Sequence, residues 1–144
     1  MNKDVTIIIT EDDEGHAMLI QKNLRRSGVS NPFRHFLDGQ DVLDFLFCRN
    51  DDRMDLNGSY LILLDIRMPR VDGIEVLRQM KSDERLRRIP VIMITTTDDP
   101  QEINQCHQLG CNNYITKPVD YNLFIHAIRQ LGLFFSIVEI PTSK

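Results

Sequence analysis

Residues 60–65 read Tyr-Leu-Ile-Leu-Leu-Asp, an apolar run that ends abruptly in a carboxylate. The run shows no alternation of polar and apolar residues, which indicates a strand covered by protein on both faces. A carboxylate without a partner is costly at the end of such a buried strand. We therefore interpret Asp65 as a functional residue rather than as part of an ordinary turn.

Four further segments have the character of strands, and helical patterns separate them. Residues 5–9 and 91–94 are apolar runs like the first, whereas residues 33–36 and 113–116 are weaker candidates. Apolar residues recur at helical spacing within residues 17–24, 42–47, 74–80, 103–109 and 123–131. Glycine commonly follows the end of a helix, so Gly28, Gly110 and Gly132 are expected to close the first, fourth and fifth helices.

These segments follow one another as a strand and then a helix, repeated five times. Parallel strands joined by helical crossovers place helices on both faces of one sheet, so the fold class is α/β, a three-layer (βα)5 sandwich. By analogy with the flavodoxin-like class, the expected order of the parallel strands is 2-1-3-4-5. Ligands of such sheets bind at the carboxyl ends of the strands.

Length, charge and cysteine content narrow the class of protein. The chain has 144 residues, enough for one hydrophobic core, and we expect a single domain over residues 1–132. A net charge of −4 argues against nucleic-acid binding, and no apolar stretch approaches the roughly 18 residues that cross a membrane. The three cysteines are odd in number and lack the paired spacing of zinc ligands, which favours a reducing, cytoplasmic location.

Reactive side chains collect where the predicted strands end. Glu11 and Asp12 follow the first strand, Asp65 follows the third, Thr95 follows the fourth, and Lys117 follows the fifth. Each is ordinary alone, because acids such as Asp13 cap helices and threonine is common in strands. The carboxyl ends of parallel strands lie at one edge of the sheet. The joint occurrence of these reactive residues at the strand ends therefore predicts a crevice that holds carboxylates, a hydroxyl and an ammonium group.

Such crowded carboxylates repel one another unless a cation lies between them. Mg²⁺ suits a small open site, because it takes one or two protein carboxylates together with phosphate oxygens and keeps several waters. We expect Mg²⁺ to bridge Asp12, Asp65 and an incoming phosphoryl group while Asp65 attacks phosphorus. Lys117 and a threonine hydroxyl would contact the remaining phosphoryl oxygens.

The segments that carry these residues resemble a known family. Over about residues 5–132 the chain is similar to the receiver domains of two-component response regulators. The matching segments are IIITEDD (7–13), LILLDIRMPRVDG (61–73), IPVIMITTT (89–97) and NYITKP (113–118). The resemblance implies that Asp65 accepts a phosphoryl group from a sensor histidine kinase in a Mg²⁺-dependent reaction. It also implies a signalling switch rather than a turnover enzyme.

The resemblance implies individual roles for the site residues. Asp12 would bind Mg²⁺ directly, Glu11 largely through water, and Arg67 through its backbone carbonyl. Lys117 matches the lysine of the family site.

Two further positions match the switch residues of the family. Thr95 would move toward the phosphoryl group and Tyr114 would rotate inward, which reshapes a protein-interaction surface. Thr96 stands where receivers often have a small residue, and Arg67 has a long charged side chain. Both departures leave the lifetime of the phosphoryl group open.

Two segments outside the repeating pattern bear on partners. Residues 48–58 form a polar connection that we expect to be a mobile surface loop. Residues 133–144 form an apolar tail with no separate output domain, so output is expected to pass through a partner protein. The loop and the tail resemble those of single-domain regulators paired with bacterial phytochrome-type kinases. The tail either packs on its own chain or, with the last helices and strand, forms a surface for a homodimer or a kinase.

Three other functions remain as alternatives. A flavodoxin-like FMN-binding protein would share the fold, but the acids would repel the flavin phosphate. An aspartate-nucleophile phosphatase would usually have a second acid two residues after Asp65, where Arg67 stands. A phosphorylation-independent interaction domain would not require the full set of reactive residues. The four histidines have no recognisable partner motif, and we expect them to be surface or half-buried residues.

Overall fold

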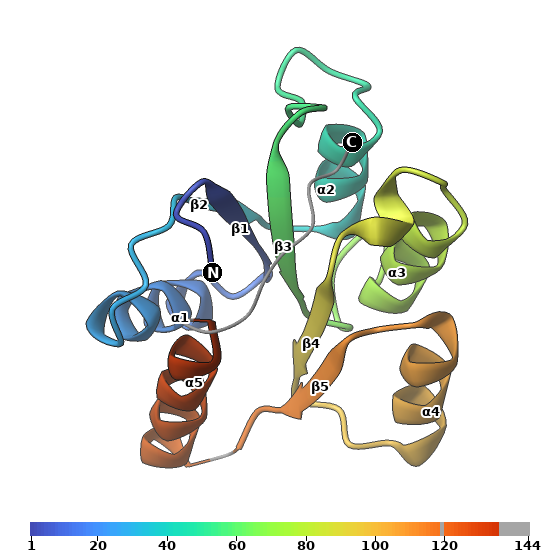
Figure 1. The fold of residues 1–144 in the computed structure, drawn as a ribbon. Helices are drawn as coiled ribbons and strands as arrows, with labels where there is room; N and C mark the ends of the chain where they lie inside the picture. The colour runs from blue at the N-terminus through green and yellow to red at the C-terminus, as the bar shows by residue number, and fades with distance from the viewer. Residues whose placement is uncertain (119, 136–144) are drawn as a thin grey trace.

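The computed structural model describes residues 1–118 and 120–135, which form one parallel sheet with helices around it (Figure 1). The sheet has five strands in the order β2-β1-β3-β4-β5. The strands are β1 (Val5–Thr10), β2 (Phe33–Phe36), β3 (Ser59–Leu64), β4 (Val91–Thr95) and β5 (Asn113–Thr116). The helices are α1 (Glu14–Arg26), α2 (Gly39–Leu46), α3 (Gly73–Lys81), the 3-10 helix η1 (Leu86–Arg88), α4 (Pro100–Leu109) and α5 (Tyr121–Phe135). The predicted fold class and strand order are confirmed.

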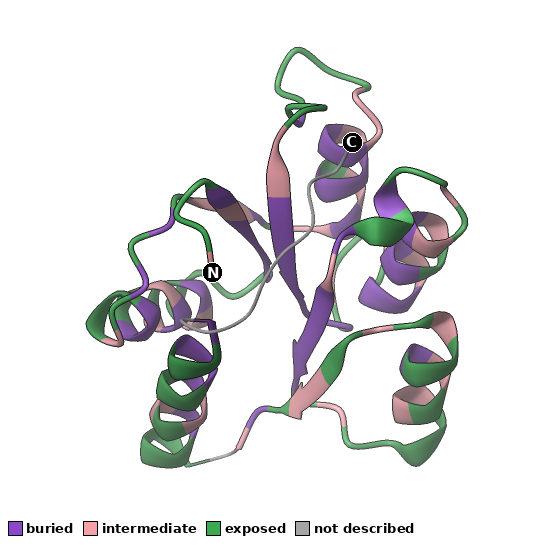
Figure 2. Cartoon of the chain, viewed as in Figure 1, coloured by how far each residue is buried: buried purple, intermediate pink, exposed green. Residues whose placement is uncertain are grey.

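Helices cover both faces of the sheet and enclose two hydrophobic cores. Ile62 and Leu64 of β3 pack in the core beneath α2, α3 and α4, whereas Leu61 and Leu63 pack in the core beneath α1 and α5. This is the alternation of a strand, with successive side chains on opposite faces. Figure 2 shows the central strands as buried. The lack of polar alternation in residues 60–64 therefore reflects burial on both faces.

All five α-helices of the described residues begin at an aspartate. Asp13, Asp38, Asp72, Asp99 and Asp120 each accept a hydrogen bond from a backbone N–H in the first turn. Such N–H groups have no partner within the helix, and a short carboxylate satisfies them. The predicted capping role of Asp13 is confirmed. Helix α4 ends at Gly110, also as predicted.

Helix α5 extends further than the sequence predicts. It passes through Gly132 and continues to Phe135, the last described residue, so the helix end expected at that glycine is wrong. The glycine serves close packing instead, because a Cβ there would lie 2.5 Å from the Cβ of Ser27, which caps the end of α1. The domain boundary expected after residue 132 falls inside this helix. Residues 136–144 of the expected tail lie outside the described part of the chain.

The polar connection before β3 carries one apolar anchor. Met54 is buried, and its N–H donates to the carbonyl of Phe45 at 3.1 Å. The N–H of Asp55 donates to the hydroxyl of Tyr60 at 2.7 Å. These contacts hold the middle of residues 48–58 against the core, a feature that composition did not indicate. The mobility of the segment stays a prediction.

The sequence predicts that the chain has no membrane-crossing helix and that its cysteines lie in a reducing environment. None of the helices in the described residues is both long and apolar enough to cross a bilayer. All three cysteines carry free thiols. Burial raises the pKa of the Cys106 thiol to about 11. Cys106 therefore acts as a packing residue of α4, because a thiol with a raised pKa is not reactive at neutral pH.

Candidate functional site

Four strand ends meet at one edge of the sheet and supply the site. Glu11 follows β1, Asp65 follows β3, Thr95 ends β4 and Lys117 follows β5. Backbone pairing continues beyond the strands: the N–H of Asp65 donates to the carbonyl of Thr10 at 3.1 Å, and that of Lys117 to Thr95 at 2.7 Å. The functional side chains are therefore held by the sheet itself rather than by loose loops.

The loop after β3 folds back tightly on Asp65. The N–H of Gly73 donates to the carbonyl of Ile66 at 2.8 Å. A Cβ at Gly73 would lie 2.0 Å from the backbone oxygen of Asp65, far inside van der Waals contact. Only glycine permits this approach of α3 to the end of β3. The glycine of the segment LILLDIRMPRVDG thus fixes the backbone that carries the aspartate.

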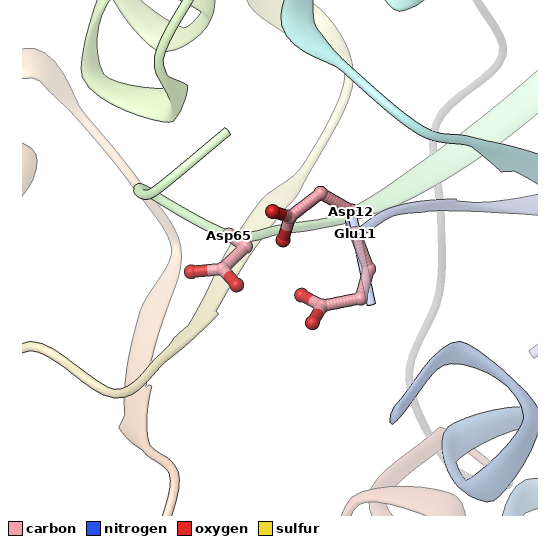
Figure 3. A group of neighbouring side chains, drawn as sticks. All are labelled: Glu11, Asp12 and Asp65. Atoms are coloured by element: carbon pink, nitrogen blue, oxygen red, sulfur yellow. The ribbon is translucent and has the colours of Figure 1, made fainter. Parts of the chain in front are cut away.

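Three carboxylates face one another in the crevice (Figure 3). Oxygens of Glu11, Asp12 and Asp65 lie within 4.8 Å of one another; Glu11 and Asp65 are buried and Asp12 is exposed. Burial, together with the hydrogen bond and charge of Asp65, raises the pKa of Glu11 to about 8. Burial also acts to raise the pKa of Asp65, but the hydrogen bond from Glu11 and the charge of Lys117 outweigh it and lower that pKa. At neutral pH Glu11 therefore holds the proton and Asp65 is ionised.

Lys117 is directed at the same carboxylates. Its Nζ lies 2.9 Å from Oε2 of Glu11 and 3.2 Å from Oδ2 of Asp65. The side chain is only 4% exposed, and a buried charge needs such paired partners. The ammonium is thus in place to meet an anionic group attached to Asp65.

Thr95 and Tyr114 lie on neighbouring strands and are joined through residue 97. The buried Thr95 hydroxyl hydrogen-bonds Asp65 and accepts the N–H of Thr97 at 3.4 Å. The hydroxyl of Tyr114 donates to the carbonyl of Thr97 at 2.8 Å. Burial raises the pKa of Tyr114 to about 12. A displacement of Thr95 and Thr97 would therefore directly change the hydrogen bond that Tyr114 makes.

Arg67 links the acidic site to α4. Its backbone N–H donates to Oδ1 of Asp65 at 3.4 Å, and its guanidinium forms an ion pair with Glu102 on α4. The second carboxylate oxygen of Glu102 is buried and has no hydrogen-bond partner in the part of the chain that the structure describes. The side chain that departs from the family pattern therefore has a defined partner on a neighbouring helix.

Two residues of the site surroundings were not identified from the sequence. His16 was expected to have no particular partner, yet its Nδ1 lies 3.3 Å from Oε1 of Glu11 and 3.4 Å from Nζ of Lys117. Its position five residues after Glu11, in the first turn of the next helix, is a signal that could have identified it. Glu102 offered no such signal, because only the packing of α4 brings it to Arg67.

Comparison with known proteins decides the family. The model of the response regulator receiver domain family matches residues 7–129. The chain belongs to this family. Receiver domains are signalling switches of two-component systems, and the identified family agrees with the resemblance seen in the sequence.

Several relatives of this receiver domain match over nearly their whole length. A response regulator receiver domain from Rhodospirillum rubrum is 48% identical, and its crystal structure superposes with a TM-score of 0.86 over 94% of this chain and 96% of that chain. Response regulator Rcp1 of Synechocystis is 31% identical over 99% of this chain and 97% of its own. The Mn²⁺-bound form of Rcp1 superposes with a TM-score of 0.87 at 28% identity, covering 94% and 98% of the two chains. The phosphorylated cyanobacterial phytochrome response regulator RcpA is 31% identical, with a TM-score of 0.84 over 94% and 97%.

The side chains present in this receiver domain fit a divalent cation. Receiver domains bind Mg²⁺ at an acidic pocket, and the oxygens of Glu11, Asp12 and Asp65 are hard ligands of the kind that Mg²⁺ prefers. The raised pKa of Glu11 also reflects a neighbouring carboxylate charge that a cation would neutralise.

Proposed function

We propose that this receiver domain accepts a phosphoryl group on Asp65 from a sensor histidine kinase and thereby switches a protein-interaction surface. The observation that supports this most is the environment of Asp65, a buried and ionised carboxylate that contacts Lys117 and faces two further acids. A purely structural aspartate would need the lysine but not the acids, because a further carboxyl group beside Asp65 can stay there only if it keeps a proton, as Glu11 does, or if a cation lies nearby.

The reaction is a phosphoryl transfer from a kinase histidine to a carboxylate. An oxygen of Asp65 attacks phosphorus, the new O–P bond forms as the P–N bond breaks, and the imidazole leaves with the bonding electrons and takes up a proton. The lowered pKa keeps Asp65 in the ionised form that a nucleophile requires. Asp12, Asp65 and the carbonyl of Arg67 would hold Mg²⁺, with Glu11 acting largely through water, and the ion would neutralise charge on the phosphoryl oxygens.

Two side chains would stabilise the product. Lys117 already contacts Asp65 and would pair with a phosphoryl oxygen, and the Thr95 hydroxyl would donate to another. Tyr114 would then exchange its hydrogen bond to Thr97 for an inward position. Phosphorylation in this account favours a conformation that is already accessible to the domain, as a population shift.

The rival activities fit the site less well. A phosphatase would usually have a general acid two residues after Asp65. That position is occupied by Arg67, whose guanidinium is paired with Glu102. A flavin phosphate would meet the carboxylates of Glu11 and Asp65 rather than a cradle of backbone N–H groups.

We further propose a phytochrome-type histidine kinase in the cytoplasm as the phosphodonor. The similarity to response regulators such as RcpA supports this choice. For the output, a homodimer or a downstream protein would use the surface of β5 and α5. Leu123 and Phe134 of α5 are 58% and 45% exposed, and exposed apolar side chains of this size favour a protein contact.

The test of the proposed function is direct labelling. The protein is incubated with Mg²⁺ and acetyl phosphate, and its intact mass is compared with that of Asp65→Asn. We expect a Mg²⁺-dependent phosphoryl adduct on the unmodified chain alone. Equal labelling of both proteins, or no labelling under conditions that label another receiver domain, would contradict the proposal. Steady turnover of phosphate esters would favour the phosphatase instead.

A further inference from the structure

His16 lies at the boundary between the acidic site and helix α5. It is the third residue of α1, and its ring packs edge-on against Phe124 of α5 at a centroid distance of 5.8 Å. Its Nδ1 faces the interior of the site, 3.4 Å from Nζ of Lys117 and 3.3 Å from Oε1 of Glu11. A weaker contact of 3.8 Å reaches Oδ2 of Asp13, the cap of α1. The side chain itself is half-buried.

The role of His16 beside the acidic site follows from the hydrogen bonds that Lys117 makes. An ammonium group has three donor protons and cannot accept. Glu11 Oε2 and Asp65 Oδ2 take two of the protons, and the side chain is 4% exposed, so water is nearly excluded from the third. In the described part of the chain, the remaining acceptor that the structure places within reach is Nδ1 of His16. Nδ1 must then be unprotonated, with the ring proton on Nε2.

We propose that His16 is a positioning residue for phosphorylation: its Nδ1 accepts the third hydrogen bond of Lys117 and holds the ammonium beside Asp65. The inference rests on the proposed function, because it assigns His16 a part in the reaction at Asp65. It follows from the hydrogen-bond geometry around one buried ammonium.

The contact between His16 and Lys117 differs from the contacts of Lys117 with Glu11 and Asp65, because the three acceptors respond differently to a bound cation. Glu11 and Asp65 are carboxylates that a divalent cation also attracts, so both can weaken their hold on Lys117 when a cation binds. An imidazole nitrogen engaged by the lysine retains its contact without carrying a competing negative charge. Lys117 thus keeps one fixed partner in the protein while its other two protons turn to the phosphoryl oxygens.

Two substitutions separate the acceptor from the packing of the ring. His16→Leu keeps apolar bulk against Phe124 but removes the acceptor. His16→Asn loses the ring but places an amide oxygen near the position of Nδ1. His126→Leu is the matched control, because this histidine is exposed on α5. Thermal unfolding of each variant reports whether the fold is retained.

The first measurement is the rate of phosphorylation by acetyl phosphate at fixed Mg²⁺. We expect His16→Leu to slow it by about tenfold, as for loss of one hydrogen bond to a charged group. His16→Asn should recover most of the rate, and His126→Leu should leave it unchanged. A wild-type rate in His16→Leu would overturn the inference. So would an equal loss in both variants at position 16, which would assign the effect to the ring packing.

The second measurement does not depend on phosphorylation. Nitrogen NMR shifts of the imidazole in the unphosphorylated protein distinguish the two tautomers, and we expect the proton of His16 on Nε2. A proton on Nδ1 would show that the ring donates to Glu11 and would overturn the inference even in a protein that is phosphorylated normally. If the unmodified chain takes up no phosphoryl group at all, the proposed function fails while this result still tests the contact.

Discussion

At the scale of single residues, the proton on Glu11 connects pH, stability and cation binding. The pKa of Glu11 is raised from 4.5 to about 8, so between these values the folded chain holds a proton that the unfolded chain has lost. The contribution of this carboxyl to stability is therefore fully present below pH 4.5 and is lost as the pH rises through about 8. Asp65 acts in the opposite sense, since its lowered pKa contributes stability that is lost in acid, as the pH falls below 3.8.

Glu11→Gln should remove the first of these effects. Without divalent cations, we expect the free energy of unfolding of the unmodified protein to fall between about pH 5 and about pH 8 relative to the variant. Urea denaturation at a series of pH values with a chelator measures this difference. Parallel pH profiles of the two proteins would show that Glu11 does not hold the proton.

The same proton predicts a pH dependence of Mg²⁺ binding. A cation competes with the proton on Glu11, so the affinity for Mg²⁺ should rise by up to about tenfold per pH unit below pH 8 and level off above it. Glu11→Gln should bind more weakly and lose most of this dependence. Calorimetry in buffers of different ionisation enthalpy counts the protons released. Binding without proton release would contradict the expected exchange.

At the scale of elements, the ion pair of Arg67 and Glu102 joins the loop after β3 to α4. Glu102 has a side chain that is 17% exposed, so loss of its partner leaves a largely buried charge. We expect Arg67→Gln to lower the stability by about 1 kcal/mol, a modest value because the arginine itself is 63% exposed. Amide hydrogen exchange in α4 should quicken.

Adding Glu102→Gln to Arg67→Gln is the matched control. The double variant has no unpaired charge and should recover much of the slow exchange in α4. If Arg67→Gln alone leaves both the stability and the exchange of α4 unchanged, the ion pair does not join the two elements.

The elements were predictable from the sequence where burial and capping are local properties. The apolar run before Asp65 identified β3, and the aspartate at position 13 identified the start of α1. Gly132 misled the prediction, because a glycine that closes a helix and one that lets two helices approach look alike in sequence. The second role depends on Ser27, the residue that caps the end of α1 more than a hundred residues away. Glu102 was missed for the same reason, because only the packing of α4 brings it to Arg67. His16 is different, since its place five residues after Glu11 was a local signal that could have been read.

At the scale of the whole molecule, α5 combines core and surface residues at its end. Phe135 is 1% exposed in the core, whereas the adjacent Phe134 is 45% exposed. A truncation that tests the expected tail must therefore follow residue 135, because one after Gly132 would remove a core side chain.

Phe134→Gln tests the proposed homodimer without truncation. If this face joins two copies, we expect the variant to raise the dissociation constant at least about tenfold, since a buried aromatic side chain often dominates such a contact. Met18→Gln is the control, because Met18 is a 69% exposed apolar residue on α1. Sedimentation velocity over a range of concentrations measures both. Equal behaviour of the two variants and the unmodified chain would argue against a dimer through this face.

The function proposed for this receiver domain depends on which atom receives the phosphoryl group. Borohydride reduces an acyl phosphate on aspartate to homoserine, so peptide mass spectrometry after phosphorylation and reduction identifies the acceptor residue. We predict Mg²⁺-dependent conversion of Asp65 to homoserine, with Asp12 and Asp13 unchanged. Conversion at another aspartate, or labelling of Asp65 that is independent of Mg²⁺, would contradict the account.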